Sequence, residues 1–285
     1  MILNYIHWNP DPEIINVFGF SLRYYGLLFV SGLILSIYIL GWIFKRENLP
    51  PENLEKLSVY GMIGILAGAR LGHCLFYEPS YYLSHPLEMI LPITFPPDGG
   101  IKFIGYQGLA SHGGALGLLI ALYFYSRKTK HSIIDTIDLI AVVAALGSGF
   151  IRLANFMNSE IIGMPTTKPW GVIFDQVDNV PRHPAQLYEA ISYFIIFAIM
   201  MILYDKLRDK LKNGFFFGLV LVLIFTARFI IEFVKEDQVG FENGMTFNMG
   251  QLLSLPYIVV GIGFMIYGIK RTKNLAHNNV SYEKP

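Results

Sequence analysis

Residues 134–163 read IDTIDLIAVVAALGSGFIRLANFMNSEIIG, an apolar run that ends in a polar cluster. The apolar part, residues 134–156, is long enough to cross a bilayer as a helix, which takes about 20 residues. Four polar residues lie at its end or just beyond it: Arg152, Asn155, Asn158 and Glu160. An ionised side chain costs about 2.5–3.5 kcal/mol on membrane-insertion scales, so residues kept there are expected to be functional.

A continued helix would bring the polar residues of this stretch together. Arg152, Asn155 and Ser159 would then share one face, with Glu160 beside them. This polar stripe is the strongest indication of function in the chain.

Six further stretches resemble the first one in length and apolar character. Hydrophobic residues make up 53% of the chain and charged residues only 15%, as expected for a protein built largely from membrane helices. The sequence therefore predicts an all-α integral membrane protein with about seven transmembrane helices and a single domain over residues 1–285. The predicted spans are 22–44, 57–76, 108–125, 134–156, 185–204, 215–234 and 252–269. Glycines and charges interrupt the second and fourth.

Basic residues indicate how these spans are oriented. With seven spans, four basic clusters fall on one side of the membrane: residues 45–56, 127–130, 206–212 and 270–273. The positive-inside rule assigns that side to the cytoplasm. The N-terminus is then extracytoplasmic, and residues 270–285 form a cytoplasmic tail.

The opposite side carries the longer loops, residues 78–106 and 158–184. They are too long for simple connections and are candidates for handling substrate in a small extracytoplasmic head. Residues 4–20, with Trp8 and two prolines, are expected to lie against the outer interface as a short amphipathic segment.

Composition excludes several function classes. The net charge of +1 gives no indication of a nucleic-acid partner, and the single cysteine, Cys74, excludes a disulfide framework. No cluster of aspartates indicates a magnesium site.

Further polar residues are expected at the outer ends of the spans. These residues are Tyr25, Arg70, His73, His112, His183, Gln186, Tyr188, Glu189, Arg228 and Glu232. Each also has a structural interpretation. Arg228 and Glu232 are spaced for a helical ion pair, Arg70 for snorkelling, and the tyrosines for interfacial anchoring. A lone intramembrane histidine is usually a hydrogen-bonded packing residue.

The density of polar residues at one membrane depth favours function. Arginine forks bind phosphate, and a histidine accepts a proton near neutral pH. Together they describe an enzyme that handles a phospholipid from within the bilayer.

At this point the chain resembles a known family. GFIRLANFMNSEIIG matches the signature of the prolipoprotein diacylglyceryl transferases. The likeness covers essentially the whole chain and includes five more motifs in the family's order: YIHWNPDP, RYYG, SHGG, RHPAQLYE and RFIIEF.

The resemblance implies a reaction and a location. Such enzymes of the bacterial cytoplasmic (inner) membrane move a diacylglyceryl group from phosphatidylglycerol to the lipobox cysteine of a prolipoprotein, releasing glycerol phosphate. The implied partners are phosphatidylglycerol, the prolipoprotein signal peptide and membrane lipids. The resemblance implies no metal and no organic cofactor.

The resemblance also implies roles for individual residues. Arg152 and Arg228 match the essential arginines, and His112 matches the proposed base, although it need not be the sole base. The implied substrate-binding residues are Tyr25, Arg152, Asn155, Glu160, Gly163, Arg228 and Glu232, the last as partner of Arg228. Supporting residues are Arg70, Asn158, His183 and Glu189.

Three other functions compete with this one. A retinal protein would need a lysine in the last span, and residues 252–269 have none. A transporter would more typically show inverted repeats and broken helices. A head-group phosphotransferase would need grouped carboxylates for magnesium.

Overall fold

The computed structural model describes residues 5–17, 20–96, 99–103, 108, 110–211, 214–236 and 245–280, without the side chains of 17, 20, 103, 111 and 270–280. It is mostly helical. The helices are α1 (Tyr24–Arg46), α2 (Pro51–Phe76), α3 (Pro79–Ser84), α4 (Pro86–Ile90), α5 (Ser111–Thr129), α6 (Ile133–Met157), α7 (Ala185–Leu207), α8 (Phe215–Ile231), the 3-10 turn η1 (Glu232–Val234) and α9 (Met249–Val280).

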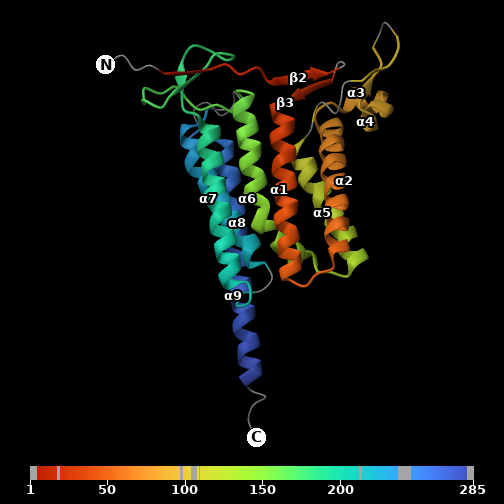
Figure 1. The fold of residues 1–285 in the computed structure, drawn as a ribbon, viewed down its shortest axis with the longest axis vertical. Helices are drawn as coiled ribbons and strands as arrows, with labels where there is room; N and C mark the ends of the chain where they lie inside the picture. The colour runs from red at the N-terminus through yellow and green to blue at the C-terminus, as the bar shows by residue number, and fades with distance from the viewer. Residues whose placement is uncertain are drawn as a thin grey trace. The chain divides into compact units, whose positions relative to one another are not determined.

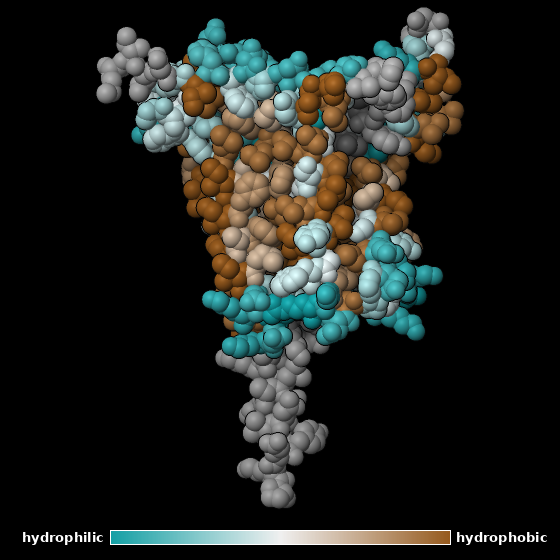
Figure 2. Space-filling model, in the orientation of Figure 1, coloured by the Kyte–Doolittle hydropathy of each residue, from teal (hydrophilic) through white to brown (hydrophobic). Residues whose placement is uncertain are grey.

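Six described helical segments are long and apolar enough to cross a membrane. They are Tyr24–Arg46, Pro51–Phe76, Ile133–Met157, Ala185–Leu207, Phe215–Val234 and Met249–Ile269. Figure 2 shows hydrophobic residues along the flanks of the helices and hydrophilic residues gathered towards their ends. The prediction of a multi-pass helical membrane protein is thus confirmed.

The predicted third span corresponds to α5, which does not reach the same apolar average. Its 19 residues begin with Ser111 and His112 and end with Arg127, Lys128 and Thr129. Polar residues at both ends lower its mean hydropathy, so the count of seven spans stays a prediction.

Short strands lie outside these helices. They are β1 (Ile6–Trp8), β2 (Glu13–Val17), β3 (Phe20–Arg23), β4 (Ile93–Thr94), β5 (Lys102–Phe103), β6 (Val172–Phe174) and β7 (Pro181–Arg182). The described part of the predicted N-terminal interfacial segment therefore consists of strands and their connections. Pro10 and Pro12 disfavour a helix there, and Ile and Val favour strands.

The chain divides into two compact units, residues 1–40 with 137–285 and residues 41–136. In the larger unit, α8 packs against both α7 and α9, and these helices run side by side in Figure 1. The expectation of a single membrane domain stays a prediction.

A three-stranded sheet lies at the end of α6 in the larger unit. β1 pairs with β6 in parallel, and β6 pairs with β7 in antiparallel fashion. Trp8 of β1 donates its indole N–H to the Phe156 carbonyl at 3.0 Å, and Phe174 packs with Phe156 in a small buried cluster. This sheet fixes the end of the helix that carries the polar stripe.

The smaller unit is built on close packing of α2 against α5. Glycines line the contact: Gly64, Gly68 and Gly72 on α2, and Gly113 and Gly117 on α5. A Cβ on Gly72 would lie 2.7 Å from the Gly113 Cα, and one on Gly68 would collide with the Gly113 carbonyl oxygen. We call these five residues the glycine seam, the small-residue packing typical of membrane helices.

Candidate functional site

Arg152 lies near the C-terminal end of α6, and its guanidinium contacts three side chains. Its Nε contacts the Glu189 Oε2 at 2.9 Å, and one terminal nitrogen donates to the Asn155 Oδ1 at 3.1 Å. The Tyr193 hydroxyl of α7 also hydrogen-bonds the Arg152 side chain. The prediction that Arg152 and Asn155 share a face is confirmed.

The helix ends at Met157, and a tight turn then brings Glu160 back towards α6. Asn155 and Asn158 each donate an amide N–H to one Glu160 carboxylate oxygen, at 2.9 and 3.0 Å. Ser159 and Ile161 have φ of 54° and 57°, a left-handed backbone that costs about 1–3 kcal/mol for residues other than glycine. Because the helix has ended, the expectation that Ser159 continues its polar face is wrong.

Glu189 of α7 is fully buried, and its carboxylate forms ion pairs with two cations. Its Oε2 binds Arg152, and its Oε1 lies 3.5 Å from the Nζ of Lys235. The same ammonium lies 3.3 Å from the Glu232 Oε2. Lys235 therefore links two buried carboxylates, one of which holds Arg152.

Glu232 is thus paired differently from the expectation. Its ion pair is with Lys235, and the structure shows none between Glu232 and Arg228. The physical reason is the change of helix type, since η1 begins at Glu232. Residues three apart eclipse in a 3-10 turn, which favours Lys235 over the α-helical partner at i−4.

The side chain of Arg228, on α8, forms no hydrogen bond or ion pair with any residue that the structure describes. Its Nε is buried and unpartnered. Arg228 and Arg152 both act electrostatically on the Tyr193 hydroxyl, which places the two guanidinium groups in one neighbourhood. We call Arg152, Glu160, Glu189, Arg228, Glu232 and Lys235 the charge cluster.

Tyr25, at the start of α1, belongs to the same neighbourhood. Its hydroxyl experiences the charges of Glu160 and Arg152. Gln186 of α7 donates to the Glu160 backbone carbonyl at 2.6 Å, while its own Oε1 is buried without a partner. The Asn158 Oδ1 and the Ser159 Oγ are also buried and unpartnered. The surroundings of Glu160 therefore offer acceptors that no described residue uses.

Gly163 and His183 lie in the backbone that borders the charge cluster. The Gly163 N–H donates to the His183 carbonyl at 3.0 Å, and a Cβ on Gly163 would lie 2.7 Å from the Val234 carbonyl oxygen. The His183 Nδ1 is 3.0 Å from the Tyr188 hydroxyl. Burial and the charge of Lys168 lower the pKa of His183, which favours its neutral form.

Two predicted site residues belong to the smaller unit. His112 lies at the start of α5 and is exposed there. Arg70 of α2 is buried and donates to the backbone carbonyls of Glu88 and Met89, at 2.6 and 3.3 Å. Its guanidinium lies 4.8 Å from the Tyr82 ring.

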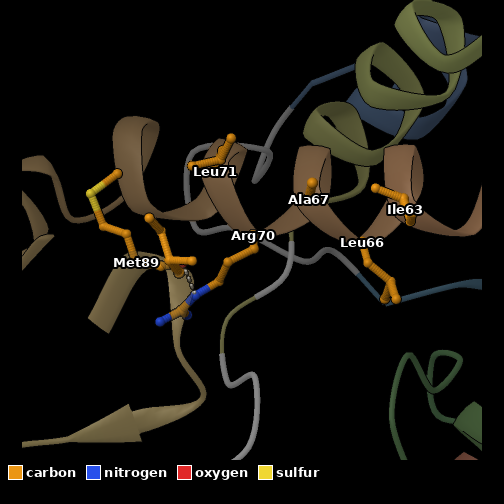
Figure 3. A pocket seen from close by; sticks show the side chains of 7 residues that line it. Ile63, Leu66, Ala67, Arg70, Leu71 and Met89 are labelled. Atoms are coloured by element: carbon orange, nitrogen blue, oxygen red, sulfur yellow. Dashed lines mark hydrogen bonds between the residues drawn. The ribbon is translucent and has the colours of Figure 1, made fainter. Parts of the chain in front are cut away.

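Arg70 also borders a cavity of about 420 Å³ whose other lining residues are apolar. Figure 3 shows its side chain extending from α2 to Met89, with the hydrogen bond drawn. This geometry gives Arg70 a role in holding α4 against α2.

Sequence reasoning missed Lys235 and Tyr193. A lysine just after a span looks like an interfacial anchor, and a tyrosine inside a span looks like packing. In the part of the chain that the structure describes, no group of three or more His, Cys, Asp or Glu residues could hold a metal ion.

Comparisons with known proteins agree over most of the chain. A family model described as prolipoprotein diacylglyceryl transferase matches residues 12–267. The phosphatidylglycerol–prolipoprotein diacylglyceryl transferase of Bacteroides fragilis is 55% identical over 268 residues, covering 94% of this chain and 97% of that protein. The proteins of the same name from Tolumonas auensis and Chloroherpeton thalassium are 42% and 40% identical. They cover 93% and 95% of this chain, and the matches span 98% and 97% of those proteins.

Proposed function

The chain belongs to the prolipoprotein diacylglyceryl transferase family, and from this premise we propose that it transfers the diacylglyceryl group of phosphatidylglycerol to the lipobox cysteine of prolipoproteins. The family predicted from the motifs is thereby confirmed, and the chain is a transferase of lipoprotein modification.

The proposed reaction is a displacement at a glycerol carbon. The cysteine thiol loses its proton, and the thiolate forms a C–S bond to that carbon. The C–O bond to phosphate breaks, and its electron pair leaves with the oxygen of glycerol phosphate. Negative charge therefore grows on the phosphate ester, where a fixed cation lowers the barrier.

One observation carries the proposal: Arg228 is a partly buried guanidinium with no counter-ion among the described residues, in the neighbourhood of Arg152. A buried charge is costly unless it is paired, so an anionic ligand is the natural partner. A phosphate ester fits because its oxygens accept forked hydrogen bonds. We assign Arg228 and Arg152 to phosphate binding and to stabilising the leaving group.

The remaining assignments follow the family motifs. Tyr25, Asn155, Glu160, Gly163 and Glu232 are proposed to shape the phosphatidylglycerol site. The unused acceptors on Asn158 and Gln186 suit hydroxyl donors such as those of a glycerol head group. Glu189 and His183 support the site, and Arg70 supports the smaller unit.

His112 is proposed to accept the thiol proton. A free cysteine has a pKa near 8.5, so it needs a base at neutral pH and less help at alkaline pH. The variant His112→Gln should therefore lose more activity at neutral than at alkaline pH. An equal loss at all pH values would assign His112 to positioning instead of proton transfer.

We further propose that α5 is a seventh span. Its 19 residues make a helix about 28 Å long, close to the hydrocarbon thickness of about 30 Å. It also packs along α2 through the glycine seam. With seven spans, the N-terminus is extracytoplasmic, the C-terminus is cytoplasmic, and the basic clusters face the cytoplasm. The proposed location is the bacterial cytoplasmic membrane, with a small extracytoplasmic head.

The decisive experiment uses purified protein in phosphatidylglycerol vesicles with a lipobox peptide. Mass spectrometry should find a diacylglyceryl thioether on the peptide together with released glycerol phosphate. A peptide with serine in place of the cysteine is the matched control and should stay unmodified, because its hydroxyl ionises far less readily. Lipid movement without a modified peptide would instead identify a transporter and reject the proposal.

A further inference from the structure

Lys235 is a buried cation to which the proposed reaction assigns no role. Its residue is only 4% exposed, and its ammonium is within 3.5 Å of the carboxylates of Glu189 and Glu232. Burying a lysine is costly unless it is paired. The ion pairs with Glu189 and Glu232 therefore stabilise the buried ammonium, and the ammonium stabilises both carboxylates.

The backbone fixes the direction of this side chain. Lys235 forms an isolated antiparallel bridge with Gly163. The Met164 N–H donates to the Val234 carbonyl at 2.9 Å, and the Glu236 N–H donates to the Ile162 carbonyl at 3.2 Å. Since a Cβ on Gly163 would meet the Val234 carbonyl oxygen, only glycine permits this approach. Gly163 thereby acts on the site through Lys235.

The two oxygens of Glu189 are divided between two cations. Oε1 faces Lys235, and Oε2 lies 2.9 Å from the Arg152 Nε in an ion pair that lacks hydrogen-bond geometry. Arg152 is consequently held through Nε, while a terminal nitrogen reaches Asn155. Without the ammonium, Oε1 would be free to take a terminal nitrogen of Arg152. The guanidinium would then turn towards Glu189 as a fork and away from the substrate side.

We propose that Lys235 is a positioning residue, whose ammonium keeps Glu189 on the Nε of Arg152 and so leaves the terminal nitrogens of that guanidinium for Asn155 and the substrate phosphate. This inference rests on the proposed function. It adds a cation that the motifs did not assign and gives Gly163 and Glu232 a shared purpose.

The charged and titratable groups around Glu189 come from four elements. Arg152 approaches from α6, Tyr193 from α7, Arg228 from α8, and Glu232 with Lys235 from η1 and the residue after it. Removing the ammonium leaves Glu189 and Glu232 as neighbouring carboxylates with one fewer cation. Like charges disfavour each other's ionised form. The contact of Glu189 with Arg152 is then expected to weaken.

The test compares Lys235→Met with Lys235→Arg in the vesicle assay, measuring kcat and KM for phosphatidylglycerol from about pH 5 to 9. Lys235→Met should lower kcat/KM by about 100-fold at neutral pH, as expected when a group near the chemistry is displaced by about 1 Å. The acid limb of its rate profile should move to higher pH. Lys235→Arg should keep the wild-type limb, because it keeps the charge.

A double variant separates charge from folding. Adding Glu232→Gln to Lys235→Met removes the second carboxylate. The acid limb of the pH–rate profile should then return towards its wild-type position, even if the maximal rate stays low. Lys210→Met, at an exposed lysine after α7, is the matched control and should leave the profile unchanged. Melting of each purified variant in detergent verifies that it is folded.

The outcomes are distinct. If wild-type protein makes no thioether, the proposed function fails. If wild-type protein is active and folded Lys235→Met keeps the wild-type acid limb, the positioning role is wrong, even when its rate is lower. A limb that shifts with Lys235→Met and returns with Glu232→Gln supports the positioning role.

Discussion

The glycine seam and the charge cluster both join membrane helices, but the seam does so with the smallest residues and the cluster with charged side chains. In the seam, Gly68 and Gly113 bring two backbones together by having no side chains. In the charge cluster, Glu189 and Lys235 join α7 to the end of α8 with buried charges. Small residues give close packing without a desolvation cost, whereas buried charges carry one. The charge cluster therefore stabilises helix packing less than small residues would. This difference favours a catalytic role for its charges over a structural one.

The largest expected effect follows from Arg228. Replacing it by alanine should lower the transfer rate by about 10²–10³-fold, the cost of losing one preorganised donor to developing charge. The free energy of unfolding should stay the same or rise, because the guanidinium has no counter-ion among the described residues. Thioether formation and melting of the same preparation measure the two effects.

Arg208→Ala is the matched control for that variant. Arg208 pairs at 3.2 Å with the buried carboxylate of Asp138, which also accepts the Phe217 N–H at the start of α8. Its removal strands a buried charge and should reduce stability by about 3–5 kcal/mol. If Arg228→Ala were destabilised to the same degree, Arg228 would be a structural residue and the contrast with the seam would fail.

The second effect concerns the seam itself. Gly68→Ala places a methyl group against the Gly113 backbone, which cannot move aside as a flexible side chain can. Overpacking of this kind costs about 1–3 kcal/mol of unfolding free energy.

Gly61→Ala, on the same helix, sharpens the comparison. A Cβ there would lie 3.9 Å from the Leu118 side chain, an ordinary contact. Alanine is favoured over glycine in a helix interior by about 1 kcal/mol, so this variant should be neutral or more stable. Equal destabilisation of the two variants would show that α2 and α5 do not pack through the seam.

The third effect tests whether strain accompanies the charges. Ser159→Gly should raise the unfolding free energy by about 1 kcal/mol, because glycine tolerates the left-handed φ of 54°. It also removes a buried hydroxyl that has no partner. Turnover should fall if the turn holds Glu160 in place.

Ser148→Gly supplies the control for that substitution. Ser148 lies inside α6 and bonds the Ala144 carbonyl, so glycine there should destabilise the helix by about 0.5–1 kcal/mol. Opposite signs for the two serines would confirm strain in the turn, whereas the same sign would refute it.

The long apolar helices could be predicted because the bilayer itself dictates their length. The predicted span 134–156 became Ile133–Met157, and the span predicted from residue 185 begins at Ala185. The strand Ile6–Trp8 could not be predicted, since its partner Val172–Phe174 is far away in the sequence and three residues give no period. For the site, single motifs identified Arg152, Asn155 and Glu160, whose contacts are local. Lys235 contacts Glu189, which lies on α7 and far away in the sequence. Lys235 also contacts Glu232, where the chain changes from an α-helix to a 3-10 turn. The i,i+4 spacing of Arg228 and Glu232 assumes a continuous α-helix and therefore predicted a different partner for Glu232.

The smallest expected effect lies at the border of the charge cluster. Arg182 binds both carboxylate oxygens of Asp178 and also reaches the Gly163 carbonyl, so it ties β7 to the backbone near Lys235. Its hydrogen bonds lower the pKa of Asp178. A carboxylate whose pKa is lowered in the folded state stabilises the fold at pH values above its pKa in the unfolded chain, near 3.9. That contribution is lost as the pH falls through its pKa in the folded state.

Asp178→Asn should therefore be less stable than the wild type at neutral pH, with the gap closing in acid below about pH 4. Melting temperatures from about pH 7 to 3 measure it. Because Asp178 is partly exposed, the gap should be small and weaken in high salt. A gap that is constant with pH would mean that Asp178 acts by shape alone. Buried Glu189 should differ here, since salt screens a pair sealed from water much less, so Glu189→Gln should cost stability that added salt does not reduce.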